Sequence, residues 1–83
     1  MIEINEISLL TLTNCPHCHT AKILLDKYKI KYREINFDNE ENKEIFQKLK
    51  INHVPYLLVP KSEGYDLIDG DININNWVKK HIV

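Results

Sequence analysis

A β-rich run at residues 7–13 passes directly into the sequence Cys-Pro-His-Cys, and this junction strongly constrains what the chain can fold into. The run ends at Asn14, a residue type that favours turns and helix caps. Beyond Pro16, which suits a first helical turn because its missing N–H would be unpaired there, apolar residues recur at spacings of three and four. These residues are Cys18, Ala21, Leu25 and Tyr28. We therefore predict a strand that leads through both cysteines into a helix.

The rest of the chain alternates between strand-like and helix-like patterns. Residues 30–37 alternate as a strand does, and residues 38–50 begin with capping and acidic residues before a helical apolar spacing. Residues 54–60 form a short apolar run, and residues 63–71 join a glycine turn to an alternating pattern, which together indicate an antiparallel hairpin. Residues 73–83 form a last amphipathic segment, for which Asn73 is the expected N-cap. Its expected apolar face consists of Ile74, Trp77, Val78 and Ile82.

These elements predict an α/β fold in the order β-α-β-α-β-β-α. Every apolar face finds a partner if the strands form one four-stranded mixed sheet flanked by three helices, with helices on both faces. The first two strands are then parallel and joined by a right-handed crossover through the first helix. A chain of 83 residues can build one small core, so we expect a single domain over residues 1–83. This arrangement is the thioredoxin fold in its minimal form.

Charge and hydropathy narrow the class of partner. The formal net charge is -1, which gives no field for attracting nucleic acid or an anionic membrane surface. No apolar run approaches the roughly 20 residues of a membrane helix, and the first residues lack the basic and apolar regions of a secretory signal. We therefore expect a cytoplasmic protein, a monomer, with neither nucleic acid nor membrane as partner. Two cysteines in a reducing compartment are more often catalytic or metal-binding than structural.

The segment Asn14-Cys15-Pro16-His17-Cys18-His19 fits three chemistries. A c-type haem site would use His19 and a second axial ligand, but the only methionine is the first residue. A closed zinc site needs four ligands, and the remaining candidates, His53 and His81, form no closely spaced pair. We therefore favour a redox dithiol and expect no metal ligand. Zinc shared between molecules stays an open alternative, and so does a bridged iron–sulfur cluster, although Pro16 argues against the cluster.

The predicted helix makes the two cysteines unequal. At the N-cap, Cys15 meets unpaired backbone N–H groups and the positive end of the helix dipole, which stabilise a thiolate and lower its pKa. Cys18 lies one turn deeper, beside Ala21 and Leu25, and is expected to be shielded until a mixed disulfide forms on Cys15. We predict that Cys15 is the nucleophile and Cys18 the resolving thiol.

Several of these features together resemble the glutaredoxin family over essentially the whole chain. They are the C-x-x-C between first strand and first helix, the Val54-Pro55 pair at the start of the third strand, and the glycine turn before a helix bearing "NNWVKK". The resemblance implies a thiol–disulfide oxidoreductase that reduces protein disulfides or glutathione mixed disulfides. It also implies that the Val54-Pro55 bond is cis and that the Val54 backbone pairs with substrate.

The residues between the cysteines are expected to tune the redox potential. Glutaredoxins commonly carry Pro-Tyr there, whereas Pro16-His17 matches the pair of a periplasmic disulfide oxidase whose reduced form is unusually stable. If the His17 ring lies near the Cys15 sulfur, it favours the reduced form and makes the protein more oxidising. The alternative is that His17 is simply an exposed helix residue.

Glutathione is the expected reductant, with no bound cofactor, and disulfide-containing proteins are the expected partners. The resemblance places the substrate- or glutathione-binding groups at the residues His17, His53, Val54, Pro55, Asp71, Ile72 and Asn73. The family usually has Lys or Arg three residues before the first cysteine, where this chain has Leu12, so one carboxylate anchor is missing. Two alternatives stay open. One is a thioredoxin-like or ribonucleotide-reductase electron donor reduced by a flavoprotein reductase, and the other is a non-enzymatic module that binds metal or protein.

Overall fold

A computed structural model describes residues 6–81 and contains one four-stranded sheet with the strand order β2-β1-β3-β4. β1 pairs in parallel with β2 and antiparallel with β3, and β3 pairs antiparallel with β4. The elements are β1 (Ser8–Thr11), α1 (Pro16–Lys27), β2 (Arg33–Asn36), the 3₁₀ turn η1 (Glu40–Asn42), α2 (Lys43–Leu49), β3 (Tyr56–Lys61), β4 (Gly64–Asp69) and α3 (Gly70–His81). The predicted order of strands and helices and the mixed sheet are confirmed.

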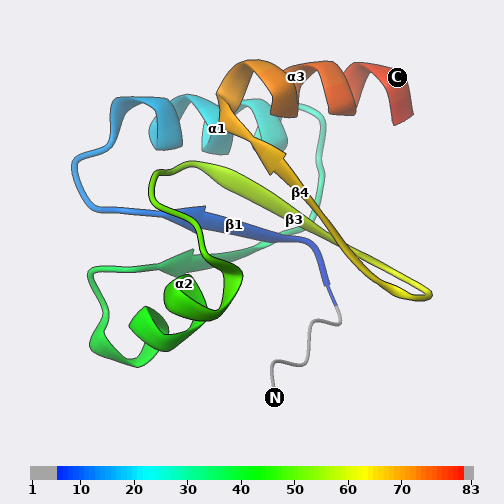
Figure 1. Ribbon diagram of the computed structural model, residues 1–83. Helices are drawn as coiled ribbons and strands as arrows, with labels where there is room; N and C mark the ends of the chain where they lie inside the picture. Colours follow the sequence, from blue (N-terminus) through cyan, green and yellow to red (C-terminus); the bar gives the residue numbers. More distant parts are fainter. Residues whose placement is uncertain (1–5, 82–83) are drawn as a thin grey trace.

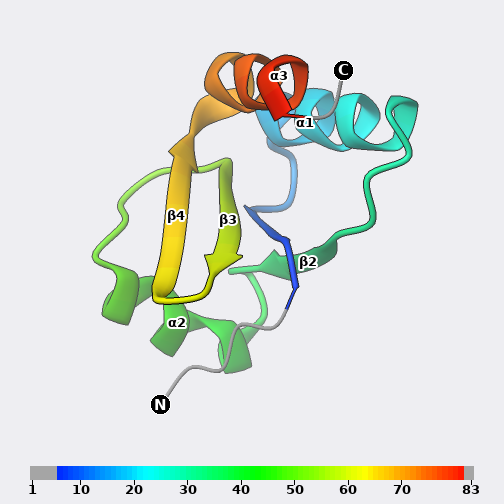
Figure 2. The ribbon, with the colours of Figure 1, turned by 90° about the vertical axis from the view of Figure 1, so that its right-hand side faces the viewer.

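The sheet is covered on both faces. α1 and α3 lie side by side over one face, and α2 lies against the other, as two perpendicular views show (Figures 1 and 2). The three helices are 12, 7 and 12 residues long, and within residues 6–81 none is long and apolar enough to cross a membrane.

The alternation of side chains along β1 divides the core into two clusters. Leu9 points into the cluster under α1 and α3, and its neighbour Leu10 points into the cluster under α2. The first cluster contains Leu9, Ala21, Leu25, Leu57, Ile74 and Val78. The second contains Leu10, Ile35, Phe37 and Ile51. Both faces of the internal strand β1 are therefore buried, which is typical of a strand covered by helices on both sides.

The strands on either side of α1 are both shorter than the apolar pattern predicts. β1 ends at Thr11, and residues 12–14 form a turn in which Asn14 adopts a left-handed backbone conformation, with φ 60°. β2 begins only at Arg33, although the apolar alternation begins at residue 30. The reason is that alternation reports burial, and Ile30 and Tyr32 pack against the first core cluster from outside the strand.

The predicted N-cap of the last helix is wrong. α3 begins at Gly70, and Asn73 lies inside its first turn, where the side-chain amide donates to the Asp69 carbonyl at 2.7 Å. Gly70 adopts φ 81°, a left-handed conformation that glycine reaches without strain, and its N–H donates to the Pro55 carbonyl at 2.9 Å. The glycine therefore turns the chain directly from β4 into α3. Trp77 is half-buried against the core, as predicted, and Ile82 lies outside the described residues.

Candidate functional site

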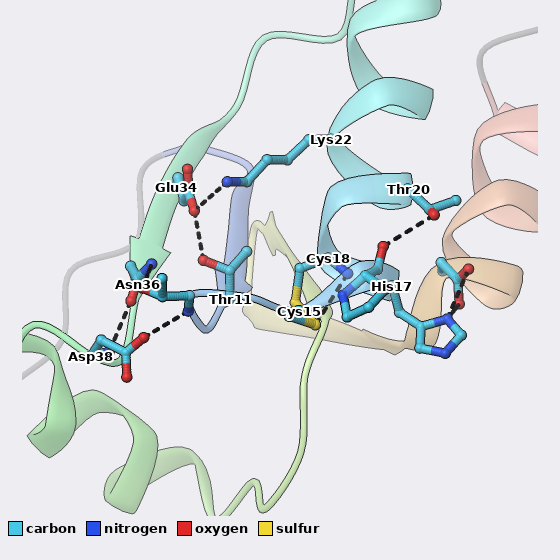
Figure 3. Close-up of a disulfide and its surroundings, with 12 residues drawn as sticks. Thr11, Cys15, His17, Cys18, Thr20, Lys22, Glu34, Asn36 and Asp38 are labelled. Atoms are coloured by element: carbon cyan, nitrogen blue, oxygen red, sulfur yellow. Dashed lines mark hydrogen bonds and ion pairs between the residues drawn. A yellow bond between two sulfur atoms is a disulfide. The ribbon is translucent and has the colours of Figure 1, made fainter.

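The two cysteines lie at the N-terminus of α1 and are joined by a disulfide bond (Figure 3). Cys15 is the N-cap, with an extended backbone, and Pro16 is the first helical residue. The Cys15 Sγ accepts a hydrogen bond from the backbone N–H of Cys18 at 3.2 Å. The predicted N-cap position of Cys15 is thus confirmed, and its sulfur lies where backbone donors stabilise negative charge.

The two sulfur-bearing residues differ sharply in exposure. Cys18 is 2% exposed and packs in the interior, whereas Cys15 is only partly buried. A disulfide that approaches from solvent therefore reaches Cys15 first, and Cys18 is placed to react with a partner already attached to Cys15. The predicted shielding of Cys18 is thus observed, and the division into nucleophile and resolving thiol stays a prediction.

The loop before Cys15 is fastened to the end of β2. The backbone N–H of Thr13 donates to the Asp38 carboxylate at 2.7 Å, and Asn36 Nδ2 donates to Thr13 Oγ1 at 3.4 Å. Hydrogen bonding from Thr13 holds the pKa of the Asp38 carboxyl below its ordinary value. These contacts fix the direction in which the chain enters the N-cap.

Both residues between the cysteines are exposed, and they face different neighbours. The Pro16 carbonyl accepts a hydrogen bond from Thr20 Oγ1 at 3.1 Å within α1. The His17 side chain is 73% exposed and its ring extends toward α3, where Nδ1 lies 3.4 Å from the Asp71 carboxylate (Figure 3). The ring thus faces Asp71 rather than the Cys15 sulfur. The predicted effect of His17 on the redox potential assumed that the ring lies near this sulfur, and that contact is not present.

Val54 and Pro55 lie just before β3, and the bond between them is cis, as the family resemblance implies. Pro55 is buried and Val54 is partly buried against the second core cluster. Because the Pro55 carbonyl accepts the Gly70 N–H, this segment is tied to the start of α3. The predicted pairing of the Val54 backbone with substrate stays a prediction.

The ring of His53 is held by contacts within the protein. Its Nε2 lies 2.7 Å from the Asp69 carboxylate at the end of β4, and its Nδ1 lies 2.7 Å from the Asn52 side-chain oxygen. The ring also packs against Tyr56, with the ring centroids 5.1 Å apart. His53 therefore links the segment before Pro55 to β4, which adds a structural role to its predicted role in substrate binding.

The predicted binding residues at the start of α3 also differ in environment. Asp71 has a side chain that is 21% exposed and faces His17, and Asn73 donates its amide to the backbone. Ile72 is 73% exposed, the highest value among the large hydrophobic side chains found exposed in the described residues. The start of α3 thus presents the Asp71 carboxylate to His17 and the Ile72 side chain to solvent.

A group that the sequence reading missed lies on the other side of the cysteines. The Lys22 ammonium lies 2.8 Å from the Glu34 carboxylate on β2, and the same oxygen accepts a hydrogen bond from Thr11 Oγ1 at 2.7 Å (Figure 3). Burial raises the pKa of Glu34, but the bonds from Lys22 and Thr11 outweigh it and lower that pKa overall. The available signal was the spacing, since Lys22 follows Cys18 by four residues and so shares its helical face.

An open pocket of about 570 Å³ lies beside the disulfide. Its walls include both cysteines, the loop before them, and Lys22. Across residues 6–81 no cluster of three or more His, Cys, Asp or Glu side chains is arranged to hold a metal ion.

Sequence comparisons relate the chain to one family of known proteins. A model of the family described as Glutaredoxin matches residues 7–61, which contain both cysteines and Val54-Pro55. The chain is 34% identical over 59 residues to Glutaredoxin 1 of Rickettsia bellii, covering 70% of this chain and 60% of that protein. It is 40% identical over 60 residues to Glutaredoxin 1 of Rickettsia typhi, covering 68% and 58%. The chain thus spans about 60% of the length of these curated relatives.

Solved structures agree with the fold. A glutaredoxin from Brucella melitensis superposes with a TM-score of 0.65 at 19% identity, covering 92% of this chain and 80% of that one. The glutaredoxin-like protein NrdH-redoxin from Escherichia coli, whose activity profile is described as thioredoxin-like, gives a TM-score of 0.66 at 20% identity, covering 84% and 91%. The fold is therefore of the thioredoxin type. With a dithiol at the N-cap of α1, a cis proline before β3 and a family match over most of its length, the chain belongs to the glutaredoxin family.

Proposed function

We propose that the protein is a thiol–disulfide oxidoreductase that reduces protein disulfides or glutathione mixed disulfides. The observation that carries the proposal is the inequality of the two cysteines. Cys15 caps the helix and is reachable, whereas Cys18 is 2% exposed. A reducing dithiol needs this division, since one thiol must meet the substrate and the other must wait for the mixed disulfide.

The reaction proceeds in two exchanges that balance in atoms and electrons. The Cys15 thiolate attacks one sulfur of a substrate disulfide, forms a mixed disulfide and releases the other half as a thiolate. Cys18, as its thiolate, then attacks the Cys15 sulfur and releases the second half. The dithiol has lost two electrons and the substrate has gained them, which leaves the Cys15–Cys18 disulfide in the protein.

The remaining predicted site residues surround this chemistry in our proposal. The Val54 backbone, before Pro55, pairs with an extended substrate segment, and Ile72 offers an apolar contact. His17 and Asp71, which face each other at 3.4 Å, and His53 and Asn73 supply polar groups around the substrate or glutathione. In the same proposal Pro16 and His17, which lie between the cysteines, tune the potential, with the His17 ring acting without direct contact to the Cys15 sulfur.

We propose glutathione as the reductant of the oxidised protein, with the cycle taking place in the cytoplasm. Two glutathione molecules supply the two electrons and leave as their disulfide. Membership of the glutaredoxin family and relatives named Glutaredoxin 1 support this choice. Asp71 provides a carboxylate for an ammonium group near the start of α3.

A second candidate reductant is a flavoprotein reductase, as for a thioredoxin or a ribonucleotide-reductase donor. Two observations favour it. Leu12 stands where the family usually has a cation, and the Asn73 amide is already bonded to the backbone. Structural similarity to NrdH-redoxin, a protein with a thioredoxin-like activity profile, is compatible with this alternative.

The function is tested with Cys15→Ser and Cys18→Ser variants in a disulfide-reduction assay. We expect Cys15→Ser to abolish reduction of a protein disulfide and Cys18→Ser to accumulate a mixed disulfide on Cys15, visible by mass spectrometry. Full activity of Cys15→Ser, or no redox cycle in the parent protein, would contradict the proposal and favour a non-enzymatic binding module.

The reductant is tested separately by supplying the oxidised parent protein with glutathione, glutathione reductase and NADPH, or with thioredoxin reductase and NADPH. We expect faster NADPH oxidation in the first system. A faster rate in the second would assign the flavoprotein reductase instead, and reduction by neither would reject both reductants.

A further inference from the structure

The pocket beside the disulfide is separate from the groups at the start of α3 that the proposed function uses. It is bounded by the loop residues 12–14, by Cys15 and Cys18, and by Lys22 and Asn36. His17, Val54 and Asp71 are not among its lining residues. A substrate that brings its sulfur to Cys15 therefore has a hollow available on the Lys22 side of the reacting atom.

The charge in this pocket has one sign. Lys22 brings a positive charge to its lining, which also includes His19, and no carboxylate lines it within the described part of the chain. Two acidic side chains lie behind the lining: Asp38 accepts the Thr13 N–H, and Glu34 accepts the Thr11 hydroxyl and pairs with Lys22. A cation without a carboxylate in the same wall favours an anionic ligand.

Lys22 is also held in place before any ligand arrives. Glu34 binds its ammonium at 2.8 Å, and Glu34 is itself fixed by Thr11, which is 0% exposed in the central strand β1. An ammonium group has three N–H donors, so one bond to Glu34 leaves donors for a ligand. The Lys22 side chain remains 35% exposed. Because the side chain is already ordered, binding costs less conformational entropy than at a free surface lysine.

Part of the pocket lining is apolar. Leu12, which is 38% exposed, and Pro16 both line it. A hollow with an apolar wall and a fixed ammonium suits a short aliphatic side chain that ends in a carboxylate.

We propose that this pocket is a specificity subsite for a carboxylate next to the disulfide sulfur of the substrate. It would accept an Asp or Glu side chain, or a terminal carboxylate, of a cysteine-containing peptide through the Lys22 ammonium. The catalytic part of this inference rests on the proposed function, because it assigns a preferred substrate class to the same site. It concerns the binding of an acidic group, which is measurable without turnover.

The first test measures binding to the oxidised protein by nuclear magnetic resonance. The ligands are short amidated peptides in which Ser replaces Cys and the neighbouring residue is Glu or Gln. We expect about threefold to fivefold tighter binding of the Glu peptide, as for a partly exposed ion pair, with shifts at the Asn14 and Asn36 amides. A third peptide, the Gln peptide with a free C-terminus, shows whether a terminal carboxylate serves as well as a side chain.

Lys22→Gln and Lys27→Gln form the matched pair of variants. Both remove one positive charge from α1, but Lys27 lies in its last turn, outside the pocket. We expect Lys22→Gln to lose the preference for the Glu peptide and Lys27→Gln to keep it. Equal binding of the two peptides by the parent protein, or an unchanged preference in Lys22→Gln, would overturn the inference.

The second test measures kcat/KM for mixed disulfides of the cysteine-containing peptides with 2-mercaptoethanol. The parent protein is expected to favour the Glu substrate by the same factor, and Lys22→Gln to favour neither. If Lys22→Gln slows both substrates equally, Lys22 acts on the chemistry and the subsite is rejected. If neither substrate turns over while the binding preference still depends on Lys22, the proposed function fails and the carboxylate site stands.

Discussion

Cys15 and Cys18 are the same residue type three positions apart, yet their surroundings make them unequal. The first is an N-cap whose sulfur accepts a backbone N–H, and the second is a core residue of the helix that follows. This difference depends on local helix geometry and requires no distant residue. It was therefore predictable from the position of the two cysteines relative to Pro16.

Glu34 offers a residue-scale test of the network beside the pocket. Its pKa is lowered in the folded protein, so its contribution to stability is present above the unfolded value, 4.5, and is lost as pH falls through the folded pKa. We expect the melting temperature of Glu34→Gln to fall less between pH 7 and acid pH than that of the parent protein. Thermal unfolding followed by circular dichroism measures both melting temperatures.

The control for that change is Glu63→Gln, at an exposed position in the turn between β3 and β4. We expect it to leave the acid dependence of the parent protein unchanged. If Glu34→Gln shows the same acid dependence as the parent, the hydrogen bonds from Lys22 and Thr11 contribute nothing measurable to folding.

At the scale of the element, α1 both positions the cysteines and builds the core. Its N-terminus carries Cys15, while one of its faces buries Ala21 and Leu25 against the sheet. The helical spacing of those residues made this helix predictable. The start of α3 was harder, because both Gly70 and Asn73 are residues that accompany helix ends, and the contact between Gly70 and Pro55 that decides between them is long-range.

Leu25 and Ile23 provide a matched pair on this helix. Leu25 is 0% exposed in the core and Ile23 is 55% exposed. We expect Leu25→Ala to lower the free energy of unfolding by about 2–5 kcal/mol, because a cavity remains where the side chain was removed. Ile23→Ala should change it by about 0.5 kcal/mol or less. Urea denaturation distinguishes the two, and similar losses for both variants would contradict the orientation of α1.

At the scale of the whole molecule, the strand and helix order followed from the sequence because each apolar pattern needed a covered face. Contacts between distant segments could not be predicted from the sequence. Lys22 on α1 meets Glu34 on β2, and His53 meets Asp69 at the end of β4. Charged residues are common on exposed helix faces and loops, so no local pattern marks which of them will meet.

The fold places the two cysteines at the N-terminus of α1, where one is reachable from solvent and the other is buried. The most direct measurement of this inequality is the alkylation rate of each thiol in the reduced protein as a function of pH, with sites identified by mass spectrometry. We predict that Cys15 reacts first and that its thiol pKa lies below the ordinary value of about 8.5. Cys18 should react slowly across the same range. Faster alkylation of Cys18, or a Cys15 thiol that titrates as an ordinary cysteine does, would contradict the assignment of Cys15 as the nucleophile.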